Sequence, residues 1–75
     1  MLLSELLPEL REIGITVIGT WEMSGKKGLT LGDPNKYFPY RSGPQYPIDC
    51  TKAANPNLTE GEVRIIRHRF GIAES

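Results

Sequence analysis

The stretch Leu58-Thr59-Glu60-Gly61-Glu62-Val63-Arg64-Ile65-Ile66-Arg67-His68-Arg69-Phe70-Gly71-Ile72 carries both the start and the stop signal of a helix. Thr59 and Glu62 have the spacing of a capping box, in which a hydroxyl and a carboxylate bond the free N–H groups of the first turn. Gly71 follows the last residue of the periodic pattern and suits the left-handed position that ends many helices. The sequence therefore predicts a closing helix between Thr59 and Gly71.

The outer side of this helix is the first candidate binding surface. Val63, Ile66 and Phe70 share one side and predict the buried stripe. Ile65 lies away from that stripe among basic residues, and two interpretations remain open: a small binding patch, or a residue that the preceding loop covers. The candidate contact residues here are Arg64, Ile65, His68 and Arg69.

The rest of the chain alternates turns with short periodic segments. Apolar residues at helical spacing predict an amphipathic helix over Ser4–Ile13, and alternation then predicts strands. Trp21 and Phe38 are expected in the core. The expected segments are a strand over Ile15–Met23, a turn over Ser24–Gly28, a strand over Leu29–Leu31, a turn over Asp33–Lys36 and a strand over Tyr37–Tyr40.

These elements predict one small α+β domain over residues 1–75, with a long irregular loop at about 42–57. Tyr46, Ile48 and Cys50 alternate within this loop, so part of it either adds a short strand or packs down as a lid. Short turns favour a three-stranded antiparallel meander, and both amphipathic helices must bury their stripes. We therefore expect an αβββα fold in which the N- and C-terminal helices pack on one face. The other face is left to solvent or to a partner.

Composition excludes several classes of function. The formal net charge is zero, so bulk electrostatics does not argue for nucleic acid or a membrane. The single cysteine, Cys50, forms no intramolecular disulfide and no cysteine-based zinc site. The first residues lack the basic segment of a signal peptide, and no apolar run approaches the ~20 residues of a membrane span. We expect a cytoplasmic protein without cofactor or metal.

The chain resembles two groups of small αβββα domains, the double-stranded-RNA-binding domains and the HicA toxins, which cleave messenger RNA. The segments that carry the resemblance to HicA are residues 4–15, which read SELLPELREIGI, and residues 58–66, which read LTEGEVRII. HicA-type cleavage needs a histidine on the first hairpin, where this chain has Lys26 and Lys27. The only histidine, His68, has no neighbouring nucleophile in the sequence, so we expect no catalytic residue.

Two further groups of residues are candidates for contacts. Lys26 and Lys27 are expected on a glycine-flanked turn, where they either contact phosphates or keep an exposed turn soluble. Arg41 lies beside aromatic residues that either stack on bases or a partner chain, or pack under the loop. These aromatic candidates are Tyr37, Tyr40 and Tyr46.

The sequence thus favours a non-enzymatic binding module that binds RNA through a double-stranded-RNA-binding or HicA-like fold. The alternative is a phage or mobile-element accessory protein that inhibits a host protein through its loop and last helix. An edge position of the third strand also allows a homodimer by strand pairing.

Overall fold

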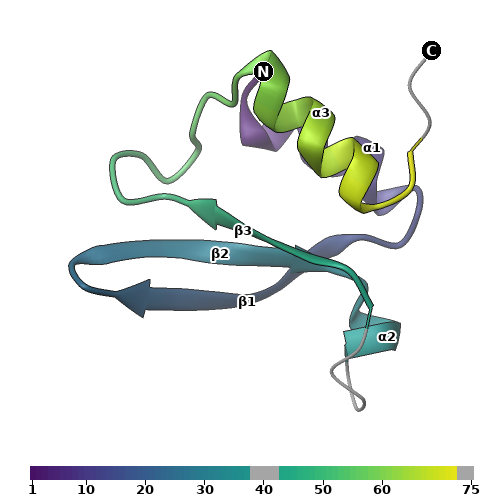
Figure 1. Ribbon diagram of the computed structural model, residues 1–75, viewed down its shortest axis with the longest axis horizontal. Helices are drawn as coiled ribbons and strands as arrows, with labels where there is room; N and C mark the ends of the chain where they lie inside the picture. The colour runs from purple at the N-terminus through teal and green to yellow at the C-terminus, as the bar shows by residue number, and fades with distance from the viewer. Residues whose placement is uncertain (38–42, 73–75) are drawn as a thin grey trace.

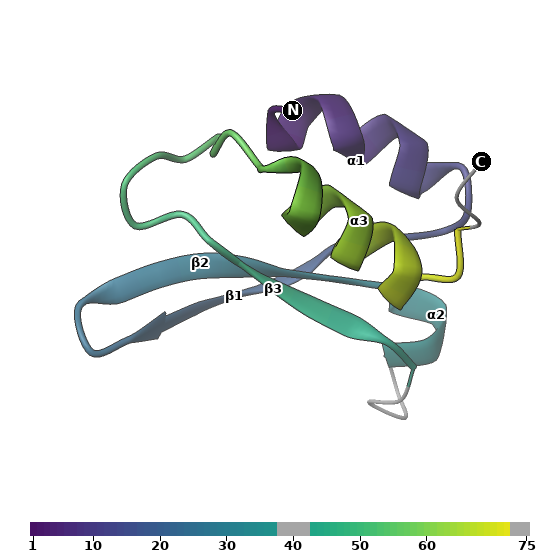
Figure 2. The ribbon, with the colours of Figure 1, turned by 45° about the horizontal axis from the view of Figure 1, so that its top comes forward.

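The computed structural model describes residues 1–37 and 43–72, with Tyr37 placed by its backbone alone. Two helices lie on the same face of a three-stranded antiparallel sheet, whose strands follow one another in the order β1-β2-β3 (Figures 1 and 2). The expected αβββα fold is confirmed, with one short helix added after the second strand. The elements are α1 (Leu3–Arg11), β1 (Thr16–Met23), β2 (Lys26–Gly32), α2 (Pro34–Tyr37), β3 (Gln45–Asp49) and α3 (Glu60–Arg69).

The first hairpin turns within two residues. Met23 pairs directly with Lys26, and the two residues between them, Ser24 and Gly25, have φ values of 51° and 79°. Two left-handed residues make a type I′ turn, which matches the twist of the flanking strands. The predicted turn over Ser24–Gly28 is therefore too long. Lys26 and Lys27 belong to β2.

The third strand is not where the sequence predicts it. The prediction named Tyr37–Tyr40, but Tyr37 ends α2, and residues 38–40 lie outside the described residues. The observed strand, β3, runs from Gln45 to Asp49 inside the predicted loop, at the alternating residues for which a short added strand was one of two interpretations. It pairs with β2 through five residue pairs, from Gly28–Asp49 to Gly32–Gln45.

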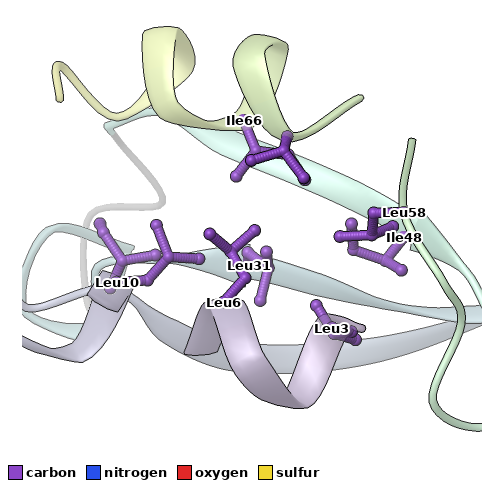
Figure 3. Close-up of a cluster of buried hydrophobic side chains, with 9 residues drawn as sticks. Leu3, Leu6, Leu10, Leu31, Ile48, Leu58 and Ile66 are labelled. Carbon is purple, nitrogen blue, oxygen red and sulfur yellow. The ribbon is translucent and has the colours of Figure 1, made fainter. Parts of the chain in front are cut away.

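The hydrophobic core fills the space between the sheet and the two long helices. Figure 3 shows side chains from α1 and α3 meeting side chains from β2 and β3. At the rim of this core, the Arg67 guanidinium donates two hydrogen bonds, of 3.0 and 3.1 Å, to the carboxylate of Glu9 and so ties α3 to α1. The buried apolar residues are Leu3, Leu6, Leu10, Ile15, Leu31, Ile48, Leu58, Val63 and Ile66.

The helix α3 begins and ends where the sequence predicts, but only half of the predicted capping box forms. The Thr59 hydroxyl accepts a hydrogen bond from the Glu62 N–H at 3.2 Å. The same hydroxyl donates to the Glu62 carboxylate, which therefore does not bond the Thr59 N–H. Gly71 is left-handed, with φ of 78°. The N–H groups of Gly71 and Ile72 donate to the carbonyls of His68 and Arg67, which is the Schellman arrangement.

Candidate functional site: the open face of the sheet

One face of the sheet carries α1 and α3, and the opposite face carries neither (Figure 2). We call this opposite face the open face. The four-residue α2 lies near the end of the sheet remote from the β1–β2 turn. Strand register, and for Ile18 its contact with Gly32, places on the open face the side chains of Thr16, Ile18, Trp21, Met23, Lys26, Thr30, Gln45, Pro47 and Asp49.

A bulge in β1 decides which side chains reach the open face. The register of β1 against β2 shifts between Val17 and Gly19, so that Ile18 is inserted. An inserted residue reverses the alternation of side chains beyond it. Val17, before the bulge, pairs with the buried Leu31 on the helix-covered side, whereas Trp21 lies on the open face. The prediction that Trp21 belongs to the core is therefore wrong.

Trp21 is the largest side chain on the open face. Its indole lies across Gly28 of the neighbouring strand, because a Cβ atom placed on Gly28 would come within 2.6 Å of the ring. The indole Nε1–H donates to the Leu29 carbonyl at 3.2 Å. The ring is thus half-buried and held in one orientation by the sheet beneath it. Met23, two residues further along β1, leaves 70% of its surface exposed.

Charge on the open face is confined to one end. Lys26 and Asp49 are its only ionisable residues within the strands, and both lie toward the β1–β2 turn. The Thr51 hydroxyl, and next the Thr51 N–H at 2.9 Å, lower the pKa of Asp49 below its ordinary value, with smaller contributions from Lys26 and Lys52. The opposite charges of Lys26 and Asp49 offset each other. Asp49 pairs with Gly28, so this charge lies close to the Trp21 indole.

The residues predicted on α3 divide into two groups. Arg64, Ile65 and His68 are exposed on the outer side of the helix, and Ile65 is 51% exposed. The loop before the helix leaves Ile65 uncovered, so the interpretation that the loop buries it is wrong. Arg69 is engaged within the fold: its guanidinium lies 6.0 Å from the centre of the Tyr46 ring, and its Nη1 donates to the Gln45 carbonyl at 3.5 Å.

The predicted aromatic surface is not assembled in the described structure. Tyr46 points to the helix-covered side, where it is half-buried against the core beside Arg69. Tyr37 ends α2, and only its backbone is described. Tyr40 and Arg41 lie outside the described residues.

Three lysines gather near the end of the first hairpin. Lys27 and Lys52 line a hollow of about 560 Å³ between the hairpin and the 51–54 segment. Lys26 and Lys52 line a second hollow, of about 680 Å³, that runs along β3 to the start of α3. Each hollow is also lined by an acidic residue. Glu22, which lies opposite Lys27 on the neighbouring strand, lines the first hollow, and Asp49 lines the second. This end of the molecule is polar and close to electrical balance.

Comparison of the chain with protein-family models, with curated proteins and with solved structures finds no match. Within residues 1–37 and 43–72, no group of three or more His, Cys, Asp or Glu residues is placed to hold a metal ion. None of the helices described is long and apolar enough to cross a membrane.

Proposed function

We propose that this protein is a non-enzymatic binding module that docks an amphipathic helix of a partner protein on its open face. The observation that supports it is the position of Trp21, whose indole is fixed over Gly28 on a sheet face that neither α1 nor α3 covers. Tryptophan is enriched among the residues that dominate binding energy. The exposed Met23 adds an adaptable apolar contact beside it.

The dimensions of the sheet favour a helix as the docked element. Neighbouring strands are about 4.8 Å apart, so the axes of the two outer strands are separated by about 10 Å. A helix with its side chains has a diameter of about 10–12 Å, so one helix covers the three strands. The same sheet already packs two amphipathic helices on its other face, and a helix on the open face would complete a three-layer arrangement.

The charges favour a protein over nucleic acid. Phosphate binding draws its affinity from several cations that each contact a phosphate. Here Arg67 is paired with Glu9, Arg69 contacts Tyr46 and Gln45, and neither lies on the open face. Exposed Glu5 in α1 and Glu12 directly after it outnumber the one exposed cation of that helix, Arg11. The single cysteine agrees with a reducing cytoplasm, where we propose that the module acts.

The test uses a matched pair of exposed apolar residues on opposite sides of the molecule. A display library of amphipathic helical peptides is selected against the protein, and the affinity of a selected peptide is measured for Met23→Glu and Ile65→Glu. Both side chains are more than half exposed, so neither change should disturb the fold. We expect Met23→Glu to weaken binding at least tenfold and Ile65→Glu to leave it within twofold.

The reverse result would contradict docking on the open face. Loss of binding with Ile65→Glu alone would place the partner on the outer side of α3, beside Arg64 and His68. Failure to select any helical peptide, under conditions where a control helix-binding domain succeeds, would also count against the proposal.

RNA binding is the second candidate, and the grouping of Lys26, Lys27 and Lys52 at the end of the hairpin favours it. It is tested by titrating labelled RNA at low salt and again near physiological salt. Binding that weakens steeply with salt, and that is lost in a Lys26→Glu, Lys27→Glu double variant, would support it. An absence of binding at low salt would exclude it.

A further inference from the structure

The two edges of the sheet differ in how they are protected. The Cys50 N–H donates to the Lys27 carbonyl, so Cys50, and by alternation Ile48 and Tyr46, direct their backbone groups toward β2. Gln45, Pro47 and Asp49 therefore direct theirs to the outer edge of β3.

Two features close the β3 edge to another strand. Pro47 has no N–H to offer, and Arg69 occupies the Gln45 carbonyl. Proline and a long basic side chain are devices by which natural sheets protect their edges. The expected homodimer through the third strand is therefore disfavoured by these two residues.

The β1 edge lacks such protection beyond its bulge. The Lys27 carbonyl points to β3, so the backbone groups of Lys27 do not face β1. Glu22, which lies opposite Lys27 on β1, therefore makes no backbone hydrogen bond to β2. The N–H and C=O of Glu22, and by alternation those of Thr20, point to the outer edge. Within the described residues, no hydrogen bond is recorded to these outward groups. The segment Gly19–Met23 contains no proline, and Glu22 is its only charge.

We propose that a second copy of this chain pairs with β1 in antiparallel orientation, with the two-fold axis at Trp21. The bulge at Ile18 limits regular pairing to Gly19–Met23, and Trp21 is the middle residue of that segment. In this register Thr20 of each copy lies opposite Glu22 of the other, and each pair exchanges two backbone hydrogen bonds. No like charges face each other. A two-fold axis at Glu22 would instead place two carboxylates directly opposite, which is destabilising.

The symmetry has a consequence for the open face. A two-fold axis between antiparallel strands runs perpendicular to the sheet, so both copies present the same face to the same side. The two sheets then form one six-stranded sheet. The two open faces join into a single surface centred on the paired β1 strands.

The experiment measures mass and amide exchange together. Sedimentation equilibrium over a concentration series is expected to show a monomer that shifts to a dimer. Hydrogen exchange followed by NMR is expected to show that the Thr20 and Glu22 amides gain protection as concentration rises. The Asp49 amide, which points outward on the other edge, serves as the internal control and should not change.

Two substitutions at one position make the test specific. Thr20→Pro removes an outward N–H without removing a bond of the hairpin itself, and it should abolish the dimer. Thr20→Val keeps the backbone N–H and C=O, and it should dimerise like the unmodified chain. The Trp21 indole N–H resonance reports that the hairpin remains folded in both, because its bond to the Leu29 carbonyl depends on the sheet.

Three results would overturn the proposal. The first is a monomer at the highest soluble concentration, with Thr20 and Glu22 amides that exchange independently of concentration. The second is a dimer that persists in folded Thr20→Pro. The third is concentration-dependent protection of Asp49 instead of Thr20, which would place the contact on the β3 edge.

Discussion

The indole of Trp21 lies so close to Gly28 that the structure has room for no side chain at that position. A Cβ atom on Gly28 would come within 2.6 Å of the ring, and it would also overlap the Ile48 carbonyl oxygen of β3. The three strands and the tryptophan meet at this point. Gly28 therefore holds Trp21 flat on the open face.

The first prediction concerns this contact. Gly28→Ala should lower the free energy of unfolding by about 1–3 kcal/mol, because either the ring or the backbone must move to accept the methyl group. Gly19→Ala is the matched control on the neighbouring strand, since a Cβ atom there meets nothing within 4 Å. Chemical denaturation of both variants checks the difference. Equal stability of the two would show that Trp21 does not rest on Gly28.

A second pair of glycines tests the limits of α3. Gly61 lies inside the helix, and an added Cβ atom would meet only the Thr59 hydroxyl oxygen at 3.9 Å. Gly61→Ala should therefore stabilise the protein by about 0.5–1 kcal/mol. Gly71→Ala should destabilise it by about 1 kcal/mol, because Gly71 has a φ of 78°. Thermal denaturation compares them, and a stabilising Gly71→Ala would contradict the left-handed end of the helix.

The third prediction concerns Asp49 and pH. Its pKa is lowered in the folded state, first by the Thr51 hydroxyl and then by the Thr51 N–H. A carboxyl with a lowered folded-state pKa stabilises the fold above its unfolded pKa, and the contribution disappears as the pH falls below about 4. Thr51→Val should raise the pKa of Asp49 toward its ordinary value in an NMR titration of the carboxyl carbon. Thr59→Val is the control and should leave that titration unchanged. A Thr51→Val titration that matches the unmodified chain would refute this assignment.

The helices were predictable from the sequence because their signals are local. The cap at Thr59, the left-handed Gly71 and the periodic apolar residues act within a few positions of one another. The position of the third strand could not be decided from the sequence, because the alternation of Tyr46, Ile48 and Cys50 fits a strand whereas Pro47 lacks the N–H that an inner strand needs. Only the tertiary structure shows that this proline faces outward on an edge, where a missing N–H costs no sheet bond.

Trp21 was assigned to the wrong face of the sheet because the sequence does not show the bulge in β1. Ile15, Val17, Trp21 and Met23 all occupy odd positions, so simple alternation assigns them to one face. The bulge at Ile18 reverses the alternation and turns the last two away from the core. Gly28 was the available signal, because a glycine within a strand often marks a close approach by a neighbour.

The central claim is that a partner helix docks over Trp21 on the open face, and NMR titration of the ¹⁵N-labelled protein with a selected helical peptide tests it most directly. We predict that the largest chemical-shift changes occur at the Trp21 indole N–H and at the amides of Met23 and Thr30, while those of Ile65 and His68 stay unchanged. Changes confined to Ile65 and His68, with the Trp21 indole resonance unmoved at saturation, would contradict the claim.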